Sequence, residues 1–163
     1  MNGLSRALAR RHAALAWCAA VLACSLPQTA RAVLGENEAS IHADQLRSGA
    51  VRRQTAASGL RVHTLTRADG STITQYVGAD GLVFAVAWRA NFKPRLDGLL
   101  GSHFATYAEG GREAMRQRPG VLHSAVVRRG DLVVESSAHL NAHVGRAWLR
   151  SKLPAGTPTD ALR

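Results

Sequence analysis

Histidine is the residue type whose spacing in this sequence first suggests chemistry. His139 and His143 lie four residues apart, a spacing that places two imidazoles on one face of a helix, as metal ligands often are. The residues around them, 136–142, follow a predicted strand and are typical of a turn, and no third ligand lies nearby. We therefore predict no metal site and keep His139 and His143 only as the candidates that would form one.

The other reactive residues form no recognisable catalytic set. His103 falls on the apolar face of a predicted helix, where a hydrogen-bonded residue at the margin of the core is the simplest interpretation. Ser102 lies between Gly101 and His103 in the same helix and lacks the second glycine of a nucleophile elbow. No glycine-rich phosphate loop is present, and the 11 acidic residues are scattered. The sequence predicts no catalytic residue, no cofactor and no enzymatic activity.

The chain is basic, with a formal net charge of +10. In the part that we expect to fold, the basic residues occur at most in pairs, such as Arg52-Arg53 and Arg128-Arg129, which are typical of a solvated surface. Only 5% of the residues are aromatic, which argues against a base-stacking platform. We predict no nucleic-acid partner and leave contact with anionic envelope components open.

Residues 1–32 have the three parts of a cleavable signal peptide in order. A basic start is followed by an apolar run over residues 13–26, which is too short to span a bilayer as a helix, and then by Ala30-Arg31-Ala32. We expect cleavage after Ala32, a periplasmic or secreted mature chain that begins at Val33, and no integral membrane span after cleavage. An alternative is a lipid anchor on Cys24. Cys18 and Cys24 both precede the expected cleavage site, so the mature chain would contain no thiol.

The first half of the expected mature chain predicts one helix and three strands. Residues 36–53 have the charge order that suits a helix dipole, and residues 56–59 end this helix. Residues 60–66 and 71–77 are predicted strands joined by a turn at Asp69-Gly70. Residues 82–88 are apolar throughout, which predicts a strand buried on both faces, with Trp88 as a core anchor.

The second half predicts another helix and three more strands. The helix begins after Pro94, is weakened at Gly110-Gly111, and is followed by a break at Pro119-Gly120. Its apolar face is formed by Leu96, Leu99, Leu100, His103, Phe104 and Tyr107. The predicted strands are residues 121–128, 132–136 and 144–149, and an irregular tail covers residues 156–163.

These elements predict an α+β fold in the order α-βββ-α-βββ, in which about six strands form an antiparallel sheet of two three-strand meanders. Residues 33–155 would form a single domain. An offset of 60 aligns Ala87-Trp88 with Ala147-Trp148 and Pro94 with Pro154. Whether the two halves are a true duplication stays open at this point.

Four segments of the expected mature chain are familiar as a set: residues 34–36, 75–89, 99–104 and 145–148. They include the strings Leu34-Gly35-Glu36 and Gly145-Arg146-Ala147-Trp148. With them the chain resembles the exported proteobacterial family catalogued as domain of unknown function 2844. The resemblance implies an exported protein of Gram-negative bacteria, and it carries over no catalytic or binding residue.

Three functions remain, in order of preference. The first is a non-enzymatic periplasmic or envelope-associated protein of unknown molecular activity. The second is a small module that binds an apolar ligand or envelope component, with the ligand held between the sheet and the second helix. The third is a His-based metalloprotein. A cavity between the two helices would favour the second, because the strand at residues 82–88 needs a cover on each face.

Overall fold

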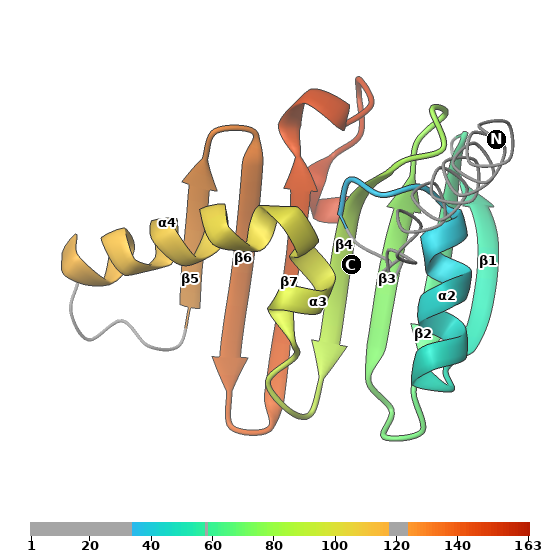
Figure 1. Ribbon diagram of the computed structural model, residues 1–163, viewed down its shortest axis with the longest axis horizontal. Coiled ribbons are helices and arrows are strands. Elements are labelled where there is room, and N and C mark those ends of the chain that lie inside the picture. The colour runs from blue at the N-terminus through green and yellow to red at the C-terminus, as the bar shows by residue number, and fades with distance from the viewer. Residues whose placement is uncertain (1–33, 58, 118–123) are drawn as a thin grey trace, which may run out of the picture.

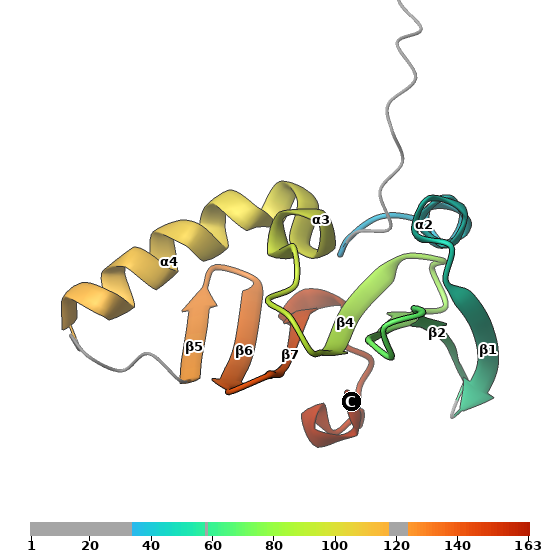
Figure 2. The same cartoon turned by 90° about the horizontal axis from the view of Figure 1, so that it is seen from below.

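The computed structural model describes residues 34–57, 59–117 and 124–163. The expected signal peptide, with Cys24 and Ala32, lies outside them. The described residues form a single antiparallel sheet of seven strands in the order β1-β2-β3-β4-β7-β6-β5, with the helices on one face (Figures 1 and 2). The strands are β1 (Val51–Ala57), β2 (Leu60–Thr66), β3 (Thr72–Val77), β4 (Val83–Ala90), β5 (Ser124–Arg129), β6 (Leu132–His139) and β7 (Ala142–Leu149). The predicted α+β class is confirmed.

The first helix is shorter than predicted, and its expected C-terminal part is a strand. Helix α2 covers Ala39–Ser48 and ends at Gly49, whose φ of 63° is left-handed. The chain then forms β1, which pairs along its whole length with β2. The expectation of a helix over residues 36–53 was wrong because a glycine cap and the pairing with β2 outweigh the local charge pattern. The sheet therefore has a four-strand meander, β1 to β4, beside the three-strand meander of β5 to β7.

The predicted strands around the Asp69-Gly70 turn are confirmed. In the turn, the Asp69 carboxylate accepts a hydrogen bond from the Ser71 amide at 2.9 Å, and Gly70 takes a φ of 78°. All residues of β4 from Val83 to Trp88 are buried, as the apolar run predicted. One face of β4 lies under the helices and the other under the C-terminal residues (Figure 2).

The second helical segment bends and then continues past its glycines. Helix α3 (Leu96–Leu100) passes through a 3₁₀ turn at Gly101–His103 into α4 (Phe104–Gln117). Leu99 and Leu100 are buried as predicted, whereas Phe104 is 36% exposed. The expected weakening at Gly110-Gly111 was wrong. A Cβ on Gly110 would lie 2.5 Å from Cγ1 of Val127, so this glycine lets α4 approach β5 closely.

The two meanders meet where β4 pairs with β7. Trp88 lies opposite Gly145, and Ala85 lies opposite Trp148. A Cβ on Gly145 would lie 2.3 Å from the Trp88 ring, so the indole packs directly on this glycine. Trp88 belongs to the apolar cluster under the helices, and Trp148 belongs to the cluster on the other face. The identity of Trp88 with Trp148 at an offset of 60 therefore joins residues on opposite faces of the sheet.

The last residues pack on the face of the sheet that lies away from the helices. Residues 156–163, expected to be an irregular tail, contain a 3₁₀ turn at Thr159–Ala161 (Figure 2). Leu162 is 2% exposed, and the Tyr76 hydroxyl donates to the Arg163 carbonyl at 2.9 Å. In the described part of the chain, no helix is long and apolar enough to cross a membrane.

Candidate functional site

The helices on the covered face do not close over the centre of the sheet. Helix α2 lies over β1 to β3, while α3 and α4 lead away over β7, β6 and β5 (Figures 1 and 2). Between α2 and α3 the surface is hollowed into a cleft of about 320 Å³. Its floor is apolar and comes from three strands and α3: Leu65, Ile73, Trp88 and Leu99.

Backbone hydrogen bonds explain why the cleft opens at one end. The Leu34 amide donates to the Leu99 carbonyl at 3.1 Å, and the Gly35 amide donates to the Val83 carbonyl at 2.8 Å. These bonds tie the segment before α2 to α3 and to the start of β4. Trp88 and Phe92, which line the cleft, lie at and beyond the other end of β4. The helices are thus held together at one end of β4 and splay at the other.

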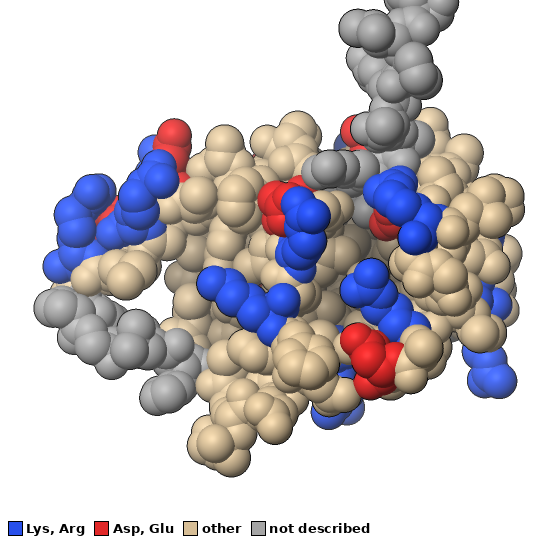
Figure 3. All heavy atoms as spheres, turned by 60° about the horizontal axis from the view of Figure 1, so that its bottom comes forward, with Lys and Arg blue, Asp and Glu red and all other residues tan. Residues whose placement is uncertain are grey.

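The mouth of the cleft is basic. The described residues contribute four cations to it: Arg47 from α2, Arg67 from the turn after β2, and Lys93 and Arg95 from the loop before α3. Figure 3, turned so that this end of the sheet comes forward, shows Lys and Arg side chains around a hollow. Such a ring raises the local concentration of anions near the opening.

Two of these cations already have carboxylate partners. Arg47 pairs with Asp44 at 3.0 Å, and Arg95 pairs with Asp97 at 2.7 Å. The hydrogen bond from Arg95 lowers the pKa of Asp97 below its ordinary value. These pairs hold the side chains in place at the rim and leave them less charge to offer a ligand.

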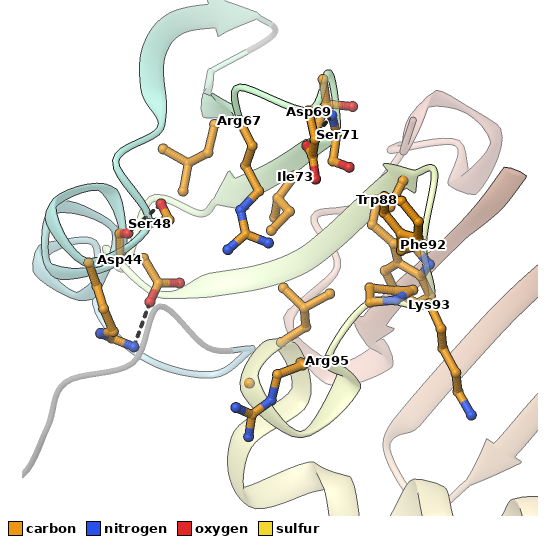
Figure 4. A pocket seen from close by; sticks show the side chains of 17 residues that line it. Asp44, Ser48, Arg67, Asp69, Ser71, Ile73, Trp88, Phe92, Lys93 and Arg95 are labelled. Carbon is orange, nitrogen blue, oxygen red and sulfur yellow. Dashed lines mark hydrogen bonds and ion pairs between the residues drawn. The ribbon is translucent and has the colours of Figure 1, made fainter. Parts of the chain in front are cut away.

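Asp69, the other acidic side chain at the mouth, is held by its own turn. The Ser71 amide that donates to the Asp69 carboxylate lowers its pKa, and Arg67 adds a smaller electrostatic effect. Between Arg67 and Asp69 there is neither a hydrogen bond nor an ion pair within 4 Å among the described residues. The Arg67 guanidinium instead points into the cleft, as Figure 4 shows.

Few side chains of the cleft, among the described residues, are of a type that could take part in chemistry. The one serine hydroxyl of its α2 wall, on Ser48, donates to the backbone carbonyl of Asp44 at 2.7 Å. Of the residues whose placement the structure gives, no histidine or cysteine lines the cleft. In the described ranges, no group of three or more His, Cys, Asp or Glu side chains is placed to hold a metal ion.

The structure places the two candidate metal ligands on a hairpin rather than a helix. His139 ends β6 opposite Ala142, and His143 in β7 lies opposite Ala138. Residues that face each other across a ladder share a face, and consecutive residues alternate. His139 and His143 therefore point to opposite faces of the hairpin and are not brought together. His103 is half-buried against Gly35, which agrees with the prediction of a residue at the core margin.

Sequence reasoning missed a buried polar network beneath the start of α2. His63 has no exposed surface, and its Nε2 lies 2.7 Å from Oε1 of Glu38. Arg52 Nε donates to His63 Nδ1 at 3.1 Å, and Arg61 pairs with Glu38 at 2.9 Å. Burial is the main cause that lowers the pKa of His63. Nearby, Gln75 is fully buried, and neither polar atom of its side chain has a hydrogen-bond partner among the described residues.

No clear signal in the sequence marks this network. On the helix-covered face, β2 carries Arg61, His63 and Leu65, which mix charged, polar and apolar types, while its other face carries Leu60 and Val62, which are half-buried against the second apolar cluster. Alternation alone cannot tell which set is buried. Only the pairing with β1, which the sequence did not predict, brings Arg52 to His63.

A comparison with protein families gives a match over most of the chain. The family model described as protein of unknown function (DUF2844) matches residues 30–162, which confirms the resemblance drawn from the sequence motifs. No curated protein and no solved structure matches the chain. In the structure, the motif residues lie at the centre of the fold: Leu34 ties α2 to α3, and Gly145 supports Trp88.

Proposed function

The chain belongs to the DUF2844 family of proteins of unknown function, and we propose that it is an exported, non-enzymatic protein that binds a small ligand in the cleft between α2 and α3. The observation that carries this proposal is the hollow between the two splayed helices, where the half-buried Ile73 and the exposed Phe92 present apolar surface beside the buried Trp88. A volume of about 320 Å³ lies at the lower end of the range of ligand sites, about 300–1,000 Å³. The ligand is therefore small.

The residues of the cleft support binding without chemistry. Trp88 and Leu99 are buried in the apolar cluster under the helices, so this part of the cleft is already in place before a ligand binds. The polar groups at the mouth are mainly cations and turn residues, and the described cleft holds no pairing of a nucleophile with a base. Such a combination favours an apolar ligand body with polar recognition confined to the rim.

Two observations support export. Residues 1–32 have the basic, apolar and small-residue order of a signal peptide. The family match begins at residue 30, so almost all of this segment lies outside the matched region. N-terminal sequencing of the protein from a periplasmic fraction should begin at Val33. A lipidated Cys24 or an intact Met1 would contradict this form of export.

Fluorescence of Trp88 tests the ligand site directly. Residues 33–163 contain two tryptophans, so Trp148→Phe leaves Trp88 as the reporter. Decanol and decanoate, as small apolar probes, should change its emission saturably. No saturable change up to millimolar concentration would contradict the proposal.

A blocking variant separates the cleft from the rest of the surface. Gly98 lines the cleft, and a Cβ there would meet open space, so Gly98→Leu should fill the mouth without strain. Gly111→Leu is the matched control, since Gly111 is also helical and also faces open space. Binding should be lost in Gly98→Leu and kept in Gly111→Leu. Equal binding by the two variants would place the probe elsewhere.

A further inference from the structure

The charges at the cleft mouth differ in how far they are already engaged. Arg47 and Arg95 each pair with an aspartate at 3.0 Å or less. Arg67 and Lys93 are exposed, and neither side chain makes a hydrogen bond or ion pair with another described residue. A ligand that reaches the mouth therefore meets two cations that form no ion pair with a described carboxylate, although the charge of Arg67 also acts on Asp69.

Of these two, Arg67 is the one aimed into the cleft. It follows β2, on the same face as Leu65, which forms part of the floor. Figure 4 shows its guanidinium reaching into the space beside Ile73, whereas the Lys93 ammonium extends away from the cleft. An anionic group held by Arg67 would thus place the rest of the ligand over the apolar floor.

The number and type of cations limit the anion. One planar guanidinium matches a carboxylate through two parallel hydrogen bonds. A phosphate monoester carries nearly two charges and is strongly hydrated, and it would need a second cation aimed at the same point. Resting on the proposed function, we infer that the ligand is a small amphipathic monocarboxylate whose carboxylate binds Arg67 while its apolar body covers Ile73 and Trp88.

The test compares decanoate with decanol in the Trp148→Phe protein, because the two probes share a chain and differ in charge. Decanoate should bind about tenfold more tightly, the usual effect of one charge-assisted hydrogen-bonded pair. Arg67→Met should abolish this preference by weakening decanoate alone. Lys93→Met, the matched control at the mouth, should change it less than about twofold, and Arg67→Lys should keep part of it.

The possible results separate this inference from the proposed function. If both probes bind equally and Arg67→Met changes nothing, the cleft is a ligand site but the carboxylate assignment is wrong. If Arg67→Met weakens the binding of both probes equally, Arg67 contributes to the shape of the cleft and does not distinguish a charged from an uncharged ligand. This result also overturns the inference. If neither probe binds at the site that Gly98→Leu is designed to block, the inference and the proposed function fail together.

Discussion

The two helical segments lie on the same face of one sheet, but one is held to it mainly by apolar contacts and the other partly by polar ones. The second segment is held by apolar contact: Leu99 and Leu100 are buried, and Gly110 lets α4 approach Val127. Helix α2 buries only Ser40 and Ile41, and a polar network that includes His63 lies beneath its start. Its Leu46 is 70% exposed.

This difference explains how a cleft persists beside a well-packed core. Helix α2 is fixed near its N-terminal end, where Glu38 binds Arg61 and His63. Its later residues Asp44, Arg47 and Ser48 line the cleft and are not drawn down onto the sheet. The α2 wall of the cleft is lightly packed, and the α3 wall is firmly packed. If α2 packed on the sheet as closely as α3 does, it would cover the space between them.

The largest effect on the difference between the two segments is expected from a charged residue in place of Leu100, the buried anchor of the second segment. Leu100 has no exposed surface, whereas Ser102, two residues on, is exposed. Leu100→Asp buries an unpaired carboxylate, which costs several kcal/mol, a cost comparable with the whole stability of about 5–15 kcal/mol of a typical domain. We expect loss of the cooperative thermal transition in Leu100→Asp and a near-normal transition in Ser102→Asp. Equal damage by both would contradict one-sided packing.

A smaller effect should follow from truncating the buried anchor of α2. Ile41 is fully buried, and removal of such a side chain costs about 2–5 kcal/mol. Ile41→Ala should therefore lower the free energy of unfolding by this amount in denaturant titrations. Leu46→Ala, on the exposed side of the same helix, should stay within about 0.5 kcal/mol. A large loss in Leu46→Ala would mean that α2 packs more broadly than described.

Alanine substitutions at the two glycines of α4 should change the free energy of unfolding in opposite directions. Alanine is favoured over glycine in a helix by about 1 kcal/mol, so Gly111→Ala, which meets open space, should stabilise the protein by about 0.5–1 kcal/mol. Gly110→Ala should destabilise it by about 1 kcal/mol, because overpacking against Val127 costs about 1–3 kcal/mol. In a Val127→Ala background, Gly110→Ala should instead become stabilising. Stabilisation by Gly110→Ala alone would contradict the close approach of α4.

The sequence predicted the parts of this fold that short-range patterns encode. The uninterrupted apolar run that became β4, the Asp69-Gly70 turn between β2 and β3, and the spacing of Leu96, Leu99 and Leu100 all correspond to local geometry. Strand β1 was missed because its residues also suit a helix, and pairing with β2 decides between the two. Gly110 was misread because its effect depends on Val127 in a strand that is distant in sequence.

From the sequence, a ligand-binding cleft could be predicted only as an alternative to a protein without one. Apolar positions on both faces of β4 require two covers, but the angle between two helices depends on contacts such as that of Leu34 with Leu99. Arg67, Lys93 and Trp88 come from three separate segments that no spacing links. The buried position of His63 likewise depends on β1, so neither the cleft nor the network could be derived from motifs.

The smallest expected effect concerns the polar anchor of α2, and it is a dependence on pH. Arg52 Nε donates to His63 Nδ1, so Nδ1 must be unprotonated, and the Nε2 proton then faces Glu38. Burial lowers the pKa of His63 below 6.5, its ordinary value, which the unfolded chain keeps. Glu38 opposes this shift, and the charges of Arg52 and Arg61 add to it. The unfolded state therefore binds the proton first, and the contribution of His63 to stability is lost as the pH falls below about 6.5.

Denaturant titrations between about pH 8 and pH 5 measure this contribution. A single proton limits its slope to about 1.4 kcal/mol per pH unit. His63→Gln should reduce the pH dependence of wild-type stability in this window, and His42→Gln, on the exposed side of α2, should preserve it because His63 remains. If wild-type stability instead rises toward pH 5, or if His63→Gln keeps the full slope, then the anchor of α2 is not a neutral imidazole held between Glu38 and Arg52. In that case the two helical segments would differ less than the structure indicates.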